Sequence, residues 1–151
     1  MVSAFMDVKI FYLPHYAGNK LGFKHPGDSG FDLPAAVAEP VVIEPGSGKL
    51  IPCGFKIEVP HGYELQVRSR SGLASGSHVF VLNSPGTVDS SYRGEVKVML
   101  FNLSGNSFTV EPGARIAQGV VSAVPQINLV EVMQLSETSR HDGGFGSTGI
   151  I

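Results

Sequence analysis

The sequence predicts an all-β fold, a jelly-roll β-barrel or sandwich with one short helix and an extended C-terminal arm. Apolar and polar residues alternate with a period of two over many short segments, as in strands with one buried face. The 19 glycines and 10 prolines interrupt almost every window long enough for a helix. Since 151 residues suffice for one domain with a substantial core, we expect a jelly-roll domain over residues 1–133 and an arm over residues 134–151.

Four segments carry the alternation most clearly, and in each the apolar residues would face a common core. Their apolar sets are Val8, Ile10 and Tyr12; Ile51, Cys53, Phe55, Ile57 and Val59; Tyr63, Leu65 and Val67; and Val96, Val98 and Leu100. Turns at residues 44–46, 60–62 and 111–113 pair a proline that fixes φ with a glycine that accepts a positive φ. We expect a helix of one or two turns to begin near Ser71, and residues 126–135 favour a strand over a helix.

The arm has a composition that cannot build a core. Its last twelve residues, 140–151, contain four glycines, one arginine, two hydroxyl side chains and one aromatic ring. These supply backbone N–H groups, a guanidinium and a flat face, which suit a nucleotide that carries a phosphate chain, although a frayed terminus has the same composition. About 15 extended residues reach roughly 50 Å, whereas the radius of gyration of such a domain is about 15 Å. The arm is therefore long enough to reach a neighbouring subunit.

Charge and cysteine content exclude several classes of protein. A net charge of −2 and a pI near 6.2 argue against binding to nucleic acid or to a membrane surface. Charged residues make up 16% of the chain, and this shortage favours an oligomer. With one cysteine, no signal peptide and no membrane-spanning run, we expect a cytoplasmic protein without an internal disulfide. Cys53 lies in an alternating segment, so a buried, inert thiol is expected rather than a nucleophile.

Four more segments place polar residues within otherwise apolar strands, namely residues 28–33, 68–74, 83–94 and 113–118. Each has an ordinary structural explanation: Asp32 closes a turn, Ser71 caps a helix, and Asp89 occupies a hairpin tip. As a set, they suit a phosphate site. The glycine-rich tail is not a P-loop because it lacks the lysine, and neither a zinc-ligand spacing nor a Gly-x-Ser-x-Gly motif is present. An Mg²⁺ ion held through phosphates and water would need no ligand cluster.

In this order and at these spacings, the segments resemble the five motifs of the trimeric dUTP diphosphatases (dUTPases), from about residue 28 to the end of the chain. The most specific matches are residues 70–74, 88–94, 115–118 and 143–149. The resemblance implies a jelly-roll homotrimer whose active sites lie between subunits, each closed by the arm of a neighbour. It also implies Mg²⁺-assisted hydrolysis of dUTP to dUMP and pyrophosphate, which limits uracil in DNA and supplies dUMP for dTTP synthesis.

The resemblance implies a role for each matching residue. Asp89 would orient and deprotonate the water that attacks the α-phosphorus. The phosphate chain would be held by Arg70, Ser71, Gly72 and Gln118, and the uracil by Asn83, Gly86, Thr87, Val88 and Lys97. Tyr92 would pack under the deoxyribose and exclude a 2′-hydroxyl. Phe145 would stack on the uracil, and the phosphate-binding part of the arm would comprise Arg140, Gly146, Ser147 and Thr148. Asp32 would position the waters of the metal or the arginine of the arm, without any direct protein ligand to the metal.

Three positions depart from the family pattern. Ser69 stands where proline is usual, which would loosen the approach to Arg70. Gly119 replaces a branched apolar residue, so the strand there is expected to be weaker. His141 and Asp142 replace small residues after the arginine of the arm, and a carboxylate at position 142 would disfavour phosphate binding unless it points outward.

Three other functions are weighed against dUTP hydrolysis. A dCTP deaminase shares the fold, but it places a glutamate where this chain has Met99, and a thioether cannot shuttle protons. A trimer that serves mainly in regulatory contact with another protein would not require the base, phosphate grip, sugar contact and arm together, although such contact remains open as an added role. A purely structural jelly roll would not explain why Asp89, Gln118 and Phe145 occur with that tail.

Overall fold

The computed structural model describes residues 5–149 and confirms the predicted class, with ten strands and one short helix in that range. Residues 1–4 and 150–151, which fall in the predicted domain and arm, lie outside the described residues. The strands are β1 (Lys9–Tyr12), β2 (Phe31–Pro34), β3 (Val41–Ile43), β4 (Gly48–Glu58), β5 (Tyr63–Arg68), β6 (Val79–Val81), β7 (Gly86–Val88), β8 (Glu95–Asn102), β9 (Phe108–Val110) and β10 (Arg115–Ala123), and the helix is α1 (Ser71–Ser77).

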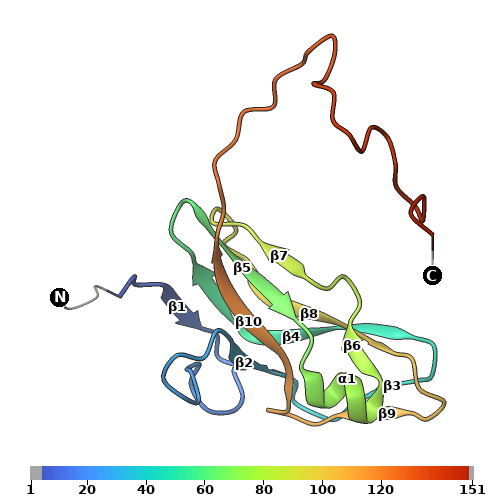
Figure 1. Cartoon of the computed structure of the whole chain (residues 1–151). Helices are drawn as coiled ribbons and strands as arrows, with labels where there is room; N and C mark the ends of the chain where they lie inside the picture. The colour runs from blue at the N-terminus through green and yellow to red at the C-terminus, as the bar shows by residue number, and fades with distance from the viewer. Residues whose placement is uncertain (1–4, 150–151) are drawn as a thin grey trace.

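Two antiparallel four-stranded sheets form the body of the molecule (Figure 1). One has the strand order β1-β4-β8-β6 and the other has the order β2-β10-β5-β7, while β3 pairs with β9 in a small third sheet. Sequence neighbours are seldom sheet neighbours, because the chain crosses repeatedly from one sheet to the other. This crossing brings distant sequence segments together, so that Asp32 on β2 lies opposite Gln118 on β10.

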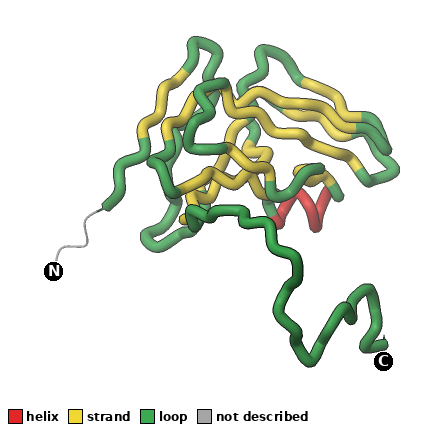
Figure 2. The backbone as a smooth tube through the Cα atoms, turned by 90° about the horizontal axis from the view of Figure 1, so that it is seen from above, coloured by secondary structure: helices red, strands yellow, loops and turns green. Residues whose placement is uncertain are grey.

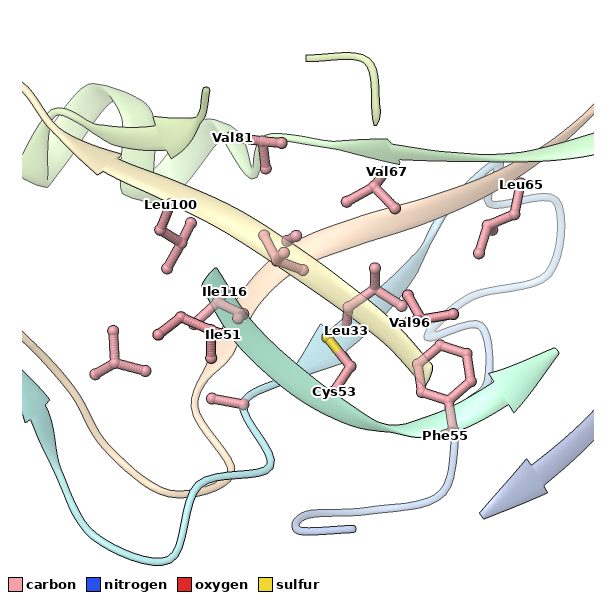
Figure 3. Packing of buried hydrophobic residues seen from close by; sticks show 14 of the residues in the cluster. Leu33, Ile51, Cys53, Phe55, Leu65, Val67, Val81, Val96, Leu100 and Ile116 are labelled. Atoms are coloured by element: carbon pink, nitrogen blue, oxygen red, sulfur yellow. The ribbon is translucent and has the colours of Figure 1, made fainter. Parts of the chain in front are cut away.

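The core lies between the two large sheets and follows the predicted alternation (Figure 3). Fully or almost fully buried side chains include Ile51, Phe55, Leu65, Val96 and Leu100. The expected burial of Cys53 is confirmed, and burial together with the nearby charge of Glu95 raises the pKa of its thiol to about 12. Such a thiol stays protonated near neutral pH and is a poor nucleophile.

Helix α1 begins directly after Arg70. Arg70 occupies the N-cap position with extended backbone angles and makes no side-chain capping bond. Ser71 is therefore the first residue of the helix, and the alternative in which it caps the helix is wrong. The last residue of the helix is Ser77, and His78 is its C-cap. The backbone of His78 is left-handed, with a φ of 54°, and its N–H donates a hydrogen bond to the carbonyl of Leu73.

The chain leaves the sheets after Ala123 and continues as an irregular segment away from the body (Figures 1 and 2). Its last backbone bond to the body runs from Val124 N–H to the carbonyl of Gly62, at 2.7 Å. The strand favoured for residues 126–135 is therefore a correction: within residues 5–149 this segment has no sheet partner, and its apolar side chains, such as Leu129 and Met133, are exposed. A strand needs a partner for its backbone groups, and a single copy of the chain offers none here.

In the part of the chain that the structure describes, no helix has the length and apolar character needed to span a membrane.

Candidate active site

Three adjacent strands position a cluster of polar side chains at one edge of the β2-β10-β5 surface. Gln118 on β10 lies opposite Asp32 of β2 on one side and opposite Arg68 of β5 on the other. The side-chain amide of Gln118 donates a hydrogen bond to the carbonyl of Ser69, at 2.9 Å. A Cβ at Gly30 would come within 2.5 Å of the Gln118 amide oxygen, so glycine at position 30 leaves room for this orientation.

Arg70 is held by two bonds before any ligand is present. Its Nε lies 2.9 Å from Oδ1 of Asp32, and one terminal nitrogen donates to the carbonyl of Arg115 at 3.0 Å. The second oxygen of Asp32 lies 3.4 Å from the guanidinium of Arg115. Asp32 therefore fixes two arginines of its own chain, and the side chain of Arg70 is only 28% exposed. We call Asp32, Arg70, Arg115 and Gln118 the phosphate-grip cluster.

Ser71 and Gly72 open helix α1 directly after this cluster and are both exposed. Nothing lies within 4 Å of a Cβ placed at Gly72, so the surface in front of the helix start is open. The departure at Ser69 behaves differently from the expected loosening. Its hydroxyl oxygen accepts a hydrogen bond from the backbone N–H of Val81 at 2.9 Å, which ties the end of β5 to β6.

A second group of predicted residues lines two small cavities beside the turn between β7 and β8, which we call the hairpin cavities after the hairpin that the sequence predicts there. In the structure the two strands belong to different sheets, because β7 pairs with β5 whereas β8 pairs with β4 and β6. The inner cavity, of about 90 Å³, is lined by Leu50, Val67, Asn83, Gly86, Thr87, Val88, Lys97 and Met99. A Cβ at Gly86 would meet Val67 at 3.2 Å and the Asn83 amide nitrogen at 3.4 Å, so a side chain at this position would require its neighbours to shift by a few tenths of an ångström. The five residues predicted to bind uracil are thus brought together, and Met99 lies among them.

The outer cavity, of about 270 Å³, contains the predicted base and the predicted sugar contact. It shares Leu50, Thr87, Val88 and Lys97 with the inner cavity and adds Asp89, Tyr92, Glu95 and Val96. Asp89 follows β7 and is exposed, and its carbonyl accepts a hydrogen bond from Tyr92 N–H at 3.0 Å. The Tyr92 hydroxyl donates to the carbonyl of Glu95, also at 3.0 Å, which fixes the ring across the turn.

The two groups lie apart within one chain. Val88 is opposite Leu65 on β5, and Arg70 follows five residues later. At about 3.4 Å per extended residue, roughly 17 Å separate these levels. Neither hairpin cavity is lined by Asp32, Arg70 or Gln118. One chain therefore does not present its own Asp89 and its own phosphate-grip cluster to the same phosphorus atom.

The arm residues contact neither group. Phe145 is fully exposed, and the hydrogen bonds described for residues 137–149 are local turns of the arm itself. Arg140 Nε, for example, donates to the carbonyl of Gly143 at 2.9 Å. The five predicted arm residues, Arg140, Phe145, Gly146, Ser147 and Thr148, are therefore not brought to the other site residues in a single copy.

The other two departures from the family pattern lie on β10, at Gly119, and in the arm, at residues 141 and 142. Gly119 is paired on both sides, with Phe31 of β2 and Val67 of β5, so β10 continues through it without interruption. A Cβ at this position would come within 3.0 Å of both Phe31 and Leu65, so the aromatic ring occupies the space that a branched residue would fill. Asp142 is exposed, two residues after Arg140.

Sequence reasoning missed three residues that belong to this geometry. Arg115 anchors Asp32, Leu50 lines both hairpin cavities, and Glu95 lines the outer one. Arg115 lay within a recognised motif, so its proximity to Gln118 in the sequence was a usable signal. Leu50 shows only alternation typical of a strand, and no sequence pattern identifies it as a cavity residue.

The acidic and imidazole side chains do not form a metal-ligand cluster. Among residues 5–149, no group of three or more His, Cys, Asp or Glu side chains is arranged to hold an ion. Asp32 has one oxygen at 2.9 Å from Arg70 and the other at 3.4 Å from Arg115, which leaves lone pairs that can accept hydrogen bonds from metal-bound water. This donor set fits an Mg²⁺ ion carried mainly by substrate phosphates and water.

Comparison with known proteins places these features in one family. The sequence model of the dUTPase family matches residues 19–149. A deoxyuridine 5′-triphosphate nucleotidohydrolase of Chlamydia trachomatis serovar D is 54% identical over 138 residues, which span 91% of this chain and 90% of that protein. The corresponding protein of Caulobacter vibrioides is 55% identical over 126 residues, covering 82% of this chain and 81% of that protein.

Solved structures give the same result for the fold. A variant of the dUTPase from Staphylococcus bacteriophage 80alpha, with dUpNHpp, has a TM-score of 0.84 at 25% identity and covers 95% of this chain and 99% of that chain. A variant of the dUTPase from phage phi11 of S. aureus, whose structure describes the coordination of a structural Mg(II) ion, has a TM-score of 0.77 at 20% identity. It covers 87% of this chain and 100% of that chain, and this likeness concerns the fold alone.

Proposed function

The chain belongs to the dUTPase family, and we propose that Asp89 is the general base in its hydrolysis of dUTP to dUMP and pyrophosphate. The observation that carries this proposal is the continuity of the two hairpin cavities. The inner one presents Asn83 and Thr87, and the outer one presents Tyr92 and Asp89. A nucleotide with its uracil inside would pass its sugar along Tyr92 and bring its first phosphate toward Asp89.

The chemistry assigned to Asp89 is proton transfer. Its carboxylate accepts a proton from a water molecule while the water oxygen bonds to the α-phosphorus. The bond between that phosphorus and the bridging oxygen of the β-phosphate breaks, so pyrophosphate leaves with the bonding electron pair. A carboxylate on a tight turn is well suited to this task because the turn fixes its direction.

Base selectivity is assigned to the inner cavity. Its small volume and the close packing at Gly86 leave little room for a 5-methyl group, which disfavours thymine. The Asn83 amide and the backbone of β7 offer polar groups that can pair with a uracil edge. Cytosine would leave such groups buried and unpaired, and a site of that kind discriminates strongly.

The phosphate chain is assigned to Arg70, Ser71, Gly72 and Gln118 of another copy. This assignment follows from the separation of roughly 17 Å along β5, which is too long for one copy to serve both ends of the scissile bond. We infer a homotrimer in which one subunit supplies the hairpin cavities and a second supplies the phosphate-grip cluster. The exposed apolar side chains of residues 127–135 are consistent with burial against another subunit.

The arm, residues 134–151, is assigned to closure of the site on a neighbouring copy. Phe145 would stack on the uracil, while Arg140, Gly146, Ser147 and Thr148 would enclose the phosphates. Closure excludes water other than the nucleophile and strengthens each charge interaction within the site. A cytoplasmic location, a lack of nucleic-acid binding and a lack of membrane binding stay predictions from composition.

Mg²⁺ is assigned as the cofactor, with no direct protein ligand. When bound, the ion would offset the negative charge that develops on the departing pyrophosphate. Asp32 would accept hydrogen bonds from its water shell, and its two arginine contacts would hold the carboxylate in place for that purpose.

A nucleotide panel tests the proposal. Pyrophosphate release is measured for dUTP, dTTP, dCTP and UTP, with Mg²⁺ and with excess EDTA, and ammonia is measured for dCTP. We expect rapid Mg²⁺-dependent release from dUTP alone. Equal rates on dTTP would remove the inner cavity as the base pocket, and ammonia from dCTP would replace hydrolysis with deamination.

A further inference from the structure

A basic cavity whose two lysines have no role in the proposed reaction lies between the loop of residues 18–24 and the start of β10. Its volume is about 460 Å³, and its charged lining residues are Lys20, Lys24, Arg115 and Asp32. Three cations thus face one carboxylate. The cavity adjoins the phosphate-grip cluster, because Asp32 lines the cavity and also bonds to Arg70.

The positive excess of this cavity is not neutralised by its own walls. The single negative charge of Asp32 is shared between Arg70 and Arg115, so it cannot neutralise both guanidinium groups. Lys20 is held over the ring of Tyr12, with its Nζ 3.7 Å from the ring centroid. Lys24 is exposed at the rim and, among residues 5–149, takes part in no ion pair. The cavity therefore attracts an anionic group.

We propose that this cavity receives the carboxylate of Asp142 from the arm of a neighbouring copy. The proposal rests on the arm closure described under Proposed function. Such a partner would hold Asp142 away from the triphosphate, which a carboxylate two residues from Arg140 would repel unless it points outward. The cationic cavity removes that repulsion and turns the carboxylate into an anchor for the closed arm.

The chain geometry allows this contact. Residues 140 and 142 are separated by at most about 7 Å between Cα atoms. If Arg140 lies on phosphates held by Arg70, then Asp142 belongs to the part of the arm that can reach the adjoining cavity, which Asp32 lines. Asp142 is exposed within the turn of residues 138–143, and this turn is fixed by bonds from His141 N–H to the Thr138 carbonyl and from Gly143 N–H to the Arg140 carbonyl, both at 3.1 Å.

A charge-swap cycle tests the proposal in the full-length protein. The variants are Lys24→Glu, Asp142→Lys and the double variant, and the measured quantities are KM and kcat for dUTP at low ionic strength. Each single variant should raise KM about three- to tenfold, because like charges then meet at the cavity, while kcat stays within about twofold. The double variant should return KM to within about twofold of the wild-type value.

The Asp142→Lys variant separates this proposal from general electrostatics. Added positive charge on the arm should lower KM if it acts only through attraction to the triphosphate, whereas the proposed contact raises KM. Lys49→Glu, an exposed reversal on β4 away from the cavity, is the matched control and should leave KM unchanged. High salt should shrink all of the differences, since exposed pairs are screened.

Two outcomes would overturn the inference while the proposed function stands. If neither single variant changes KM, the cavity does not receive the arm. If Lys24→Glu raises KM equally with aspartate or lysine at position 142, the cavity binds a phosphate oxyanion of the substrate instead. Failure of the proposed function is seen separately, as a wild-type protein that releases no pyrophosphate from dUTP.

Discussion

The phosphate-grip cluster and the arm each carry an arginine suited to binding phosphate, but only the side chains of the cluster are bonded to the body of the molecule. In the cluster, Arg70 is bonded to Asp32 and to the Arg115 carbonyl, and Gln118 is bonded to the Ser69 carbonyl. In the arm, Arg140 bonds only to its own turn, and Phe145 is fully exposed. One arginine is fixed by the sheets in a single copy, whereas the other has no partner outside the arm in the described structure.

This contrast indicates how the site divides its work. Groups proposed to lie around the reacting phosphorus are built on paired strands or follow them within two residues, as Gln118, Arg70 and Asp89 do, and such positions can hold side chains to within about 0.5 Å. Groups that must leave to admit substrate and release product are placed on a segment with no core of its own. Under the proposed function, the body would supply the geometry of the site, and the arm would supply a closure that forms only with ligand and neighbour.

Removal of the arm should have the largest effect. Deletion of residues 140–151 should lower kcat/KM for dUTP by at least about 10³-fold, because several charge-assisted phosphate contacts of about 1.5–3 kcal/mol each are lost. The thermal transition should be unchanged, since the side chains of residues 140–142 and 145–149 are exposed in the structure. Steady-state kinetics and a circular-dichroism melt measure both. An unfolded product would show that the arm is part of the fold and would end the contrast with the body.

The complementary change removes the base from the body. Asp89→Asn should lower kcat by about 10²-fold or more, in the range of a lost general base, while a non-hydrolysable dUTP analogue still binds. Single-turnover rates and calorimetric titration separate the two effects. Glu39→Gln, an exposed carboxylate away from the cavities, is the control and should retain full activity. Near-wild-type turnover of Asp89→Asn would remove Asp89 from the chemistry.

The sequence predicted which strand faces are buried better than it predicted the distances between residues of the site. Period-two alternation identified the buried faces of β4, β5 and β8, because one-sided burial imposes that pattern directly. The motifs identified Asp89, Gln118 and Arg70. The distance between Asp89 and Arg70 depends on the register of β5 against β7, which arises from pairing between remote segments and leaves no local signal.

Other errors have the same physical origin. The sequence favours a strand over residues 126–135, but an isolated strand has no bonding partner. Ser69 was judged by the proline that it replaces, although its hydroxyl gains a bond to Val81 N–H that proline cannot make. Gly119 was expected to weaken β10, and the ring of Phe31 occupies the vacated space. In each case a tertiary neighbour decides the outcome.

A smaller change tests how firmly the body holds the sugar contact. A methyl group at Gly94 would overlap the Tyr92 hydroxyl and ring, so Gly94→Ala should displace the ring from its bond to the Glu95 carbonyl. We expect the preference for dUTP over UTP to fall about tenfold through a gain of activity on UTP. The ratio of kcat/KM values measures this. Gly105→Ala, at a position with open space, is the control, and an unchanged ratio in Gly94→Ala would separate Tyr92 from sugar selection.

The smallest expected effect concerns the stiffness of the frame behind Arg70. Ser69→Ala removes the acceptor for Val81 N–H and leaves a part-buried donor unpaired, which costs about 1–2 kcal/mol of unfolding free energy. Tm should fall by about 3–6 °C for a chain of this size, while KM for dUTP changes little because the Gln118 bond uses the backbone of residue 69. Ser47→Ala removes an exposed hydroxyl bond to the Glu44 carbonyl and should leave Tm almost unchanged. Equal Tm values for the two variants would mean that water replaces the Ser69 hydroxyl, and that β5 and β6 hold Arg70 without it.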